Sequence, residues 1–352
     1  MNSSMAEALR LTRSGKLMEA TAVLQGRRSE GGTSAAAPPR EVAAGLIDLV
    51  SDGGVWRVKP APAASSSNGA VAGQGSFEDL SYRGPEGTIS YSLYRPAEAA
   101  AGMPLVVMLH GCTQSPEDFA RGTGMNALAD ELGFLVAYPR QSPGANPQKC
   151  WNWFKPGDQQ RDRGEPALLA GITRAVMAEH AIDPARVYVA GLSAGGAAAA
   201  IMAAEYPDLF AAVGIHSGLA CGSAQDLPSA MMAMKRGAAT PPGQRRFVPV
   251  ITFHGDRDST VHEVNSQQII DAASSAAGVK LDVQVEEGRS ASGRRFTRKV
   301  STNPAGAGLI EQWTIEGSGH AWSGGSAAGS YTDPSGPEAS REMLRFFLTH
   351  RR

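Results

Sequence analysis

Residues 186–200 read RVYVAGLSAGGAAAA, and this stretch decides the fold. Its first part, VYV at 187–189, is a β-branched and aromatic run that predicts a buried strand. The alanine-rich part after Gly195 predicts a helix. Ser193 stands between the two at G-x-S-x-G spacing, where glycines lack the Cβ atoms that would collide in a sharp turn. We therefore predict that Ser193 is exposed at the strand end and faces the helix N-terminus, which favours negative charge. The alternative is a Gly/Ser turn that only joins a strand to a helix.

Short apolar runs alternate with helical patterns on both sides of this stretch. Patterns of strands buried on both faces occupy residues 105–109, 134–139, 187–190, 211–216 and 248–254. Other strand patterns occupy residues 281–286, 295–300 and 309–315, and residues 77–95 alternate as an antiparallel hairpin does. Helical patterns occupy residues 116–131, 165–180, 264–277 and 337–350, and part of 222–247. This alternation predicts an α/β fold, with a mostly parallel central sheet and helices on both faces.

The first 75 residues differ from the rest in composition. Their helical patterns lie at 5–25 and 41–50, and their linker-like stretches, rich in Pro, Gly, Ser and Ala, lie at 27–39 and 60–75. The first helical pattern predicts a hairpin that docks on the chain or joins copies of it into a homo-oligomer. We therefore expect an N-terminal helical extension with a linker over residues 1–75 and a folded domain over residues 76–352.

The composition excludes several classes of partner. Apolar residues make up 42% and charged residues 19% of the 352 residues, and the formal net charge is −1. These values are ordinary for a globular protein and give no reason to expect a nucleic-acid partner. No apolar run approaches the ~20 residues that span a bilayer. The first 25 residues lack the apolar core and the cleavage site of a secretion signal, so we expect a cytoplasmic protein, with secretion as the alternative.

The cysteines indicate neither a disulfide scaffold nor a metal site. There are three, Cys112, Cys150 and Cys221, a low and odd number. One bridge with one remaining thiol stays open, without an assigned pairing. The sequence has no C-x-x-C pattern and no zinc-ligand spacing, so we expect no metal and no organic cofactor.

A serine hydroxyl needs a base to take its proton, and the base is most often a histidine that a carboxylate orients. Two later segments supply both groups, FHGDRDSTV at 253–261 and GSGHAW at 317–322, and each follows a predicted strand. We assign Asp258 as the carboxylate, with Asp256 as its rival, and His320 as the base. Because ligands bind at the carboxyl ends of the strands in such sheets, we expect these groups to gather beside the serine.

Attack on a carbonyl also needs hydrogen-bond donors for the oxygen that becomes negative. The amide of Ala194 directly follows the serine, and the HGC turn at 110–112 offers a second donor, the amide of Cys112. His110 and His254 precede glycines, so we expect them to shape turns. His216 ends another predicted strand, a position that is compatible with a place near the site, but we assign it no role.

Three tryptophans are candidates for a substrate pocket. Trp151 and Trp153 belong to CWNWF, and Trp322 follows the candidate base by two positions. We assign all three as walls of a substrate pocket, with the alternative that they are ordinary core residues. The charged run RDRGE at 161–165 is expected to be a solvated turn, or to hold the CWNWF loop by ion pairs.

Six segments together resemble the polyhydroxybutyrate depolymerase family of α/β-hydrolase esterases, to which feruloyl and acetylxylan esterases are close. They are LHGCTQ, CWNWF, RVYVAGLSAGG, YPDLFAAV, FHGDRDSTV and GSGHAWSGG, within about residues 77–350. The resemblance implies an α/β-hydrolase fold and ester hydrolysis through an acyl-enzyme, with Ser193 as nucleophile, Asp258 as acid and His320 as base. It also implies an oxyanion donor at Cys112.

We therefore expect a serine carboxylesterase that acts on short-chain or 3-hydroxyacyl esters. Residues 1–75 lie outside the resemblance, and no substrate-binding domain follows the catalytic part, so we expect soluble oligomers, small esters or an intracellular polymer as substrates. Three alternatives stay open. They are a feruloyl or acetylxylan esterase, an acyltransferase in which an alcohol replaces water, and a non-catalytic binding protein on the same fold.

Overall fold

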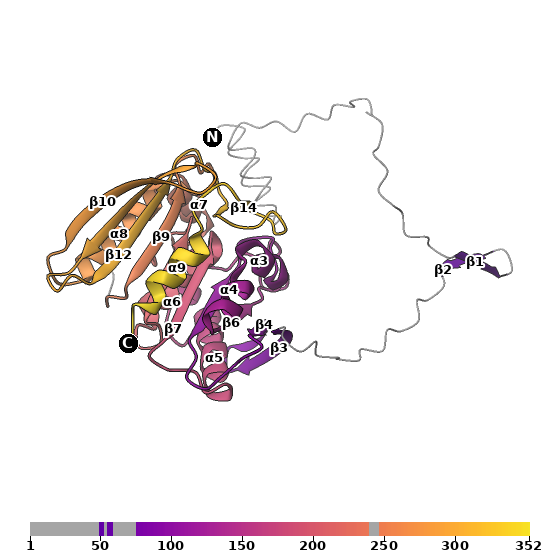
Figure 1. Cartoon of the computed structure of the whole chain (residues 1–352). Helices are drawn as coiled ribbons and strands as arrows, with labels where there is room; N and C mark the ends of the chain where they lie inside the picture. Colours follow the sequence, from indigo (N-terminus) through magenta and orange to yellow (C-terminus); the bar gives the residue numbers. More distant parts are fainter. Residues whose placement is uncertain (1–48, 53–54, 59–74, 239–245) are drawn as a thin grey trace, which may run out of the picture. The chain divides into compact units, whose positions relative to one another are not determined.

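The computed structural model describes residues 49–52, 55–58, 75–238 and 246–352. The chain divides into two units, Met1–Ala72 and Gly73–Arg352, close to the predicted boundary. In the first unit, β1 (Leu49–Asp52) and β2 (Val55–Val58) pair antiparallel (Figure 1). The helix predicted at 41–50 is wrong at its end, because its last two residues belong to β1 and pair with the β-branched and aromatic run of β2. The helical hairpin predicted at 5–25, with the homo-oligomer expected through it, lies outside the described residues.

The second unit is built on a sheet whose described strands follow the order β10-β11-β12-β9-β8-β7-β5-β6-β4-β3 (Figure 1). Its parallel centre consists of β12 (Gly308–Ile315), β9 (Val250–Gly255), β8 (Ala212–His216), β7 (Val187–Leu192), β5 (Leu105–Leu109) and β6 (Leu135–Pro139). Its antiparallel flanks are β3 (Ser76–Gly84) with β4 (Gly87–Arg95), and β10 (Asp282–Arg289) with β11 (Arg295–Thr302). The predicted parallel centre and the predicted hairpin at 77–95 are both confirmed.

Helices cover both faces of this sheet, so every residue of β5, β6, β7, β8 and β9 is buried. One face carries α5 (Gly164–Glu179), α6 (Ala194–Glu205) and α8 (Val264–Ala276), with α7 (Leu227–Arg236) against α8. The other face carries α3 (Pro116–Thr123), α4 (Met125–Leu132) and α9 (Ala339–Leu348). Strands buried on both faces explain why the central runs of the sequence are continuously apolar.

The main hydrophobic core lies between the sheet and the helices α3, α4 and α9. There the ring of Phe347 stacks on Tyr188 with the ring centroids 5.0 Å apart. Gly214 of β8 leaves room for this layer, because a Cβ at that position would lie 2.7 Å from the sulfur of Met343. Burial of one large apolar side chain such as Phe347 stabilises the fold by roughly 1.5–3 kcal/mol.

The predicted helix at 116–131 is two helices, α3 and α4, that meet at Gly124. Gly124 has a φ of 64°, and its amide donates to the carbonyl of Ala120, which ends α3. A glycine adopts this left-handed conformation without the steric cost that a Cβ atom brings, so it ends helices readily.

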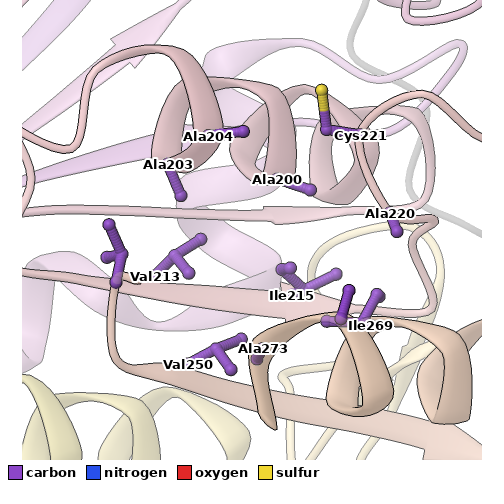
Figure 2. Close-up of a pocket in the computed structure, with 12 residues that line it drawn as sticks. Ala200, Ala203, Ala204, Val213, Ile215, Ala220, Cys221, Val250, Ile269 and Ala273 are labelled. Carbon is purple, nitrogen blue, oxygen red and sulfur yellow. The ribbon is translucent and has the colours of Figure 1, made fainter. Parts of the chain in front are cut away.

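A small cavity lies on the opposite face, between α6, α8 and the strands β8 and β9 (Figure 2). Its lining is apolar and includes Ala200, Ile215 and Ile269. None of the residues assigned to chemistry lines it, so this cavity belongs to the packing of the helix layer. Among the helices of the described part of the chain, none is long and apolar enough to cross a membrane.

Candidate active site

Ser193 occupies a strained turn between β7 and α6. Its backbone has φ 58° and ψ −119°, a conformation that non-glycine residues rarely adopt and that costs on the order of 1–3 kcal/mol. Glycines make the turn feasible, because a Cβ at Gly191 would collide with the carbonyl of Gly195, and one at Gly195 would collide with the carbonyl of Leu109. The predicted sharp strand-to-helix turn is therefore present, with the serine at its apex.

The two amides assigned as oxyanion donors lie at neighbouring turns. Ala194 is the first residue of α6, and helix-start amides have no partner within the helix. The close approach of Gly195 to the carbonyls of Leu109 and His110 brings the turn after β5 against this helix start. Among the described residues, neither the Ala194 amide nor the Cys112 amide donates a hydrogen bond to another residue. Both are thus available to a ligand, and their role as an oxyanion hole stays a prediction.

Asp258 and His320 are in direct contact. The Nδ1 of His320 lies 2.6 Å from Oδ2 of Asp258. The other carboxylate oxygen, Oδ1, accepts hydrogen bonds from the backbone amides of Thr260 and Val261 at 2.9 Å each. The carboxylate is fully buried. Desolvation acts to raise the pKa of Asp258, but the hydrogen bonds of His254 and His320 outweigh it and hold the pKa well below the usual range. The carboxylate therefore stays ionised and favours the imidazole tautomer with hydrogen on Nδ1.

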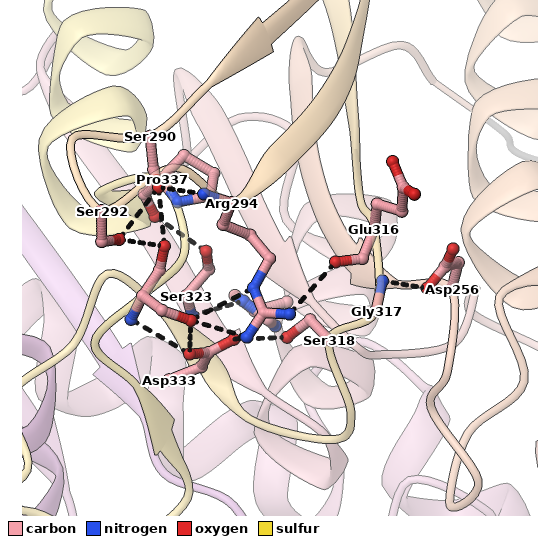
Figure 3. Close-up of polar contacts among 12 residues, drawn as sticks. Asp256, Ser290, Ser292, Arg294, Glu316, Gly317, Ser318, Ser323, Asp333 and Pro337 are labelled. Atoms are coloured by element: carbon pink, nitrogen blue, oxygen red, sulfur yellow. Dashed lines mark hydrogen bonds and ion pairs between the residues drawn. The ribbon is translucent and has the colours of Figure 1, made fainter.

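Asp256 has a different partner. It is exposed, and its Oδ1 accepts the amide of Gly317 at 2.6 Å (Figure 3). The next residue, Ser318, donates to Asp333 at 2.9 Å, and Arg294 forms an ion pair with the same carboxylate at 3.4 Å. These contacts fix the loop that carries His320, the candidate base, through Gly317 and Ser318. Asp256 therefore supports this loop, and it does not contact the imidazole.

His216 joins the turn of Ser193 to the loop of the candidate base. Its carbonyl accepts the amide of Ser193 at 2.9 Å, and its Nε2 accepts the amide of Ser323 at 3.0 Å. The ring stacks between Phe253 and Trp322, with centroid distances of 5.8 and 5.1 Å. Burial lowers the pKa of His216 to about 3, so the ring is neutral. His216 thus lies near the site as a structural residue.

His110 shapes the oxyanion turn from inside the fold. Its Nδ1 lies 2.8 Å from the carbonyl of Gly111, and its Nε2 accepts the amide of Gln141 at 3.1 Å. Burial lowers the pKa of His110 to about 4, so the neutral ring makes both contacts. The indole of Trp151 donates to the carbonyl of His110 at 3.1 Å. The turn-shaping role predicted for His110 is confirmed.

A disulfide joins Cys112 of this turn to Cys150 of the CWNWF segment, with Cα atoms 4.2 Å apart. The sequence left the pairing open, and the structure places Cys221 outside the bridge. The link holds the two loops together across 38 positions of sequence. The second donor of the proposed oxyanion hole therefore belongs to a covalently closed loop.

Breaking this bond is expected to lower the stability of the folded domain. Closing a loop of this length stabilises by about 4 kcal/mol in the chain-entropy description. The double replacement Cys112→Ser and Cys150→Ser should therefore lower the midpoint of guanidinium unfolding. Cys221→Ser, which leaves the bridge intact, is the control. Equal midpoints for the double variant and the unchanged protein would contradict a stabilising role of the bridge.

The tryptophans assigned to a pocket wall are buried. Trp151, Trp153 and Trp322 are 0%, 6% and 1% exposed, and the indole of Trp322 donates to Ser340 at 3.0 Å. They pack behind the site loops, which supports the alternative that they are core residues. Contact of these rings with substrate stays a prediction.

Tyr331, which sequence reasoning missed, lies where the two site loops meet. Its hydroxyl is 3.1 Å from Oγ1 of Thr113, next to the oxyanion turn, and its carbonyl accepts the amide of Trp322 at 2.7 Å. The residue is 39% exposed, and its backbone has a φ of 53°. An exposed aromatic ring in a strained conformation beside both loops is a candidate substrate contact. The segment GSYTDPSG around it contains no spacing that predicts this position.

The arrangement suits acyl transfer through a serine. An imidazole oriented by a buried carboxylate, a serine on a strained turn, and two available amides are the groups that this chemistry uses. Within the described ranges, no group of three or more His, Cys, Asp or Glu side chains is placed to hold a metal ion.

Residues 89–279, more than half of the chain, match the family model described as esterase PHB depolymerase. The chain belongs to this family. The match includes the turn of Ser193 and the loop of Asp258 and ends before the loop of His320. The resemblance inferred from the six sequence segments is therefore confirmed.

Relatives of this PHB depolymerase family member include bacterial and fungal enzymes. Poly(3-hydroxyalkanoate) depolymerase C of Paucimonas lemoignei is 35% identical over 247 residues, which cover 66% of this chain and 58% of that protein. Feruloyl esterase B of Thermothelomyces thermophilus is 27% identical, over 56% of this chain and 73% of that protein. The chain thus spans little more than half the length of the depolymerase.

A solved structure with the same fold is an acetyl xylan esterase from Aspergillus awamori. It aligns with a TM-score of 0.61 at 18% identity, over 78% of this chain and 99% of that one. This likeness, together with the parallel sheet and the helices on both of its faces, identifies the α/β-hydrolase fold.

Proposed function

We propose that this chain hydrolyses esters of short-chain or 3-hydroxyacyl acids through a covalent acyl-enzyme. The observation that carries the proposal is the 2.6 Å contact between Nδ1 of His320 and the buried carboxylate of Asp258. This pair follows β12 and β9, and the turn of Ser193 follows β7 at the same end of the parallel strands. A triad of Ser193, Asp258 and His320 accounts for the contact between imidazole and carboxylate, for the burial of that carboxylate, and for the place of the serine turn at the same end of the sheet.

In the proposed reaction, Ser193 attacks the ester carbonyl while Nε2 of His320 takes the hydroxyl proton. The bond between serine oxygen and carbonyl carbon forms, and the carbonyl oxygen becomes an oxyanion that the amides of Cys112 and Ala194 stabilise. His320 then gives the proton to the departing alcohol, and the acyl-enzyme remains. A water molecule, activated by the same imidazole, releases the acid and restores the serine. Asp258 holds the imidazole and stabilises its charged form throughout.

The relatives support two classes of substrate. Similarity to a poly(3-hydroxyalkanoate) depolymerase at 35% identity favours hydroxyacyl esters. Similarity to a feruloyl esterase at 27% identity makes aromatic acyl esters the second candidate. An acyltransferase differs from both in that an alcohol replaces water at the second step.

A panel of esters tests the proposal. The purified chain is expected to hydrolyse p-nitrophenyl butyrate and soluble 3-hydroxybutyrate oligomers faster than methyl ferulate, as measured by kcat/KM. Preference for methyl ferulate would favour the feruloyl esterase, and ester formation with an added alcohol would favour the acyltransferase. Absence of turnover on every ester would support the non-catalytic alternative and contradict the proposal.

A further inference from the structure

Glu165, in the first turn of α5, is a desolvated carboxylate with no part in the proposed reaction. The residue as a whole is partly exposed, but its carboxyl group faces inward onto the CWNWF loop. Oε2 accepts the amide of Asn152 at 2.7 Å, and Oε1 accepts the side-chain nitrogens of Asn152 and Gln141 at 2.5 Å each. The RDRGE run therefore does hold the CWNWF loop, through hydrogen bonds of its last residue and not through ion pairs.

These partners lead directly to the oxyanion turn. The backbone amide of Gln141 donates to Nε2 of His110, and its side chain donates also to the carbonyl of Cys150, both at 3.1 Å. Cys150 is bonded to Cys112, and Trp151 donates to the carbonyl of His110. The side chain of Glu165 thus contacts two loops, and each of them contacts the turn at 110–112.

We propose that Glu165 is a positioning residue that holds the Cys112 amide in place for the oxyanion, an inference that rests on the proposed function. The oxyanion forms only after the serine attacks. A displaced donor therefore destabilises the transition state but has little effect on the binding of the substrate. The proposal therefore concerns kcat and not KM.

The charge state of Glu165 matters for this role. Three N–H donors point at its two oxygens, and an ionised carboxylate accepts all of them. A proton on either oxygen competes with a donor and loosens Asn152 or Gln141. Desolvation raises the pKa of Glu165 to about 7, and the negative charge of nearby Asp158 adds to this effect. Asp158, which also accepts the Glu165 amide at 2.9 Å, is the charged side chain that faces Glu165 from the neighbouring turn.

Activity and stability then respond to pH with opposite signs. Ionisation of Glu165 completes the hydrogen bonds of the loop, so its contribution to kcat rises as pH rises through about 7. Folding raises the pKa of this carboxyl group, so the group stabilises the folded protein at pH values below its pKa in the unfolded chain. That stabilisation is lost as the pH rises through the pKa of the group in the folded protein. If Glu165 had only a structural role, kcat would not rise with pH over the range in which the stability of the fold decreases.

The test uses the full chain, p-nitrophenyl butyrate, and the variants Glu165→Gln and Glu179→Gln. Glutamine keeps the shape of Glu165 but turns an NH2 group toward the N–H donors, whereas Glu179 is an exposed carboxylate at the end of the same helix. At about pH 8, Glu165→Gln is expected to have a kcat about tenfold lower than the unchanged protein and a KM within about twofold of it. Glu179→Gln is expected to match the unchanged protein in both. Because loss of the Glu165 charge lowers kcat only about tenfold, the acid side of the kcat profile should be steeper around pH 7 in the unchanged protein than in Glu165→Gln, which lacks this ionisation.

An unchanged kcat in a folded Glu165→Gln, or a change confined to KM, would overturn this inference alone. If Glu165→Gln does not fold, the kcat profile of the unchanged protein decides, and an acid side that a single ionisation describes throughout would overturn the inference. Turnover by the unchanged protein separates this failure from failure of the proposed function. Absence of any turnover would overturn both.

Discussion

Replacement of Ser193 by alanine is expected to abolish ester hydrolysis, with kcat lower by a factor on the order of 10⁴ or more. Alanine has no oxygen to attack the carbonyl, and the remaining imidazole and amides act only on a water molecule. The side chain of Ser193 does not cap α6, so the variant should fold as the unchanged protein does. Turnover of p-nitrophenyl butyrate and thermal unfolding, measured together, separate lost chemistry from lost structure.

Covalent labelling supplies the matching control. A fluorophosphonate should modify the unchanged protein at the peptide that contains Ser193 and should leave the alanine variant unmodified. Retained turnover in Ser193→Ala, or a label on another peptide, would remove Ser193 from the proposed mechanism.

Asp258→Asn is expected to lower kcat by a factor on the order of 10⁴. The asparagine oxygen can still accept the amides of Thr260 and Val261, as Oδ1 of Asp258 does. Its NH2 group would then face Nδ1 of His320 and favour the tautomer with hydrogen on Nε2. That tautomer cannot take the serine proton, so kcat should fall while the fold remains.

Asp256→Asn is the paired control, two positions away on the same loop. Asparagine keeps an oxygen for the amide of Gly317, and Asp256 does not contact the imidazole. We expect a change of no more than about tenfold in kcat, because only the support of the loop is altered. Comparable losses in the two variants would show that Asp258 has no distinct role.

Much of the folded domain was predictable because its elements have strong local periodicity. The continuous apolar runs of β5, β6 and β7 reflect burial on both faces, and the turn at Ser193 follows from the steric freedom of Gly191 and Gly195. Order along the chain fits Asp256 as well as Asp258, whereas the resemblance to the family implies Asp258, and it is Asp258 that contacts His320.

The features that escaped prediction depend on contacts between distant segments. The pairing of Cys112 with Cys150, and the burial of Trp151 behind His110, require the loops to be placed in space first. Tyr331 lies in a segment rich in small residues, where the local pattern predicts only a turn. For the RDRGE run, a hold on the CWNWF loop was predicted through ion pairs, but Glu165 makes it through hydrogen bonds. The break of the helix at Gly124 had a local signal, a glycine inside a helical pattern, which helical periodicity outweighed in the prediction.

The Cys112–Cys150 bond also bears on where this chain matures. Such bonds form and persist in oxidising surroundings, and glutathione and thioredoxin keep most cytosolic cysteines reduced. We therefore propose export to a periplasm or the medium in place of the cytoplasmic location expected from the first 25 residues. Recombinant chain made in a reducing host should carry three titratable thiols, and it should gain activity as oxidation closes the bridge.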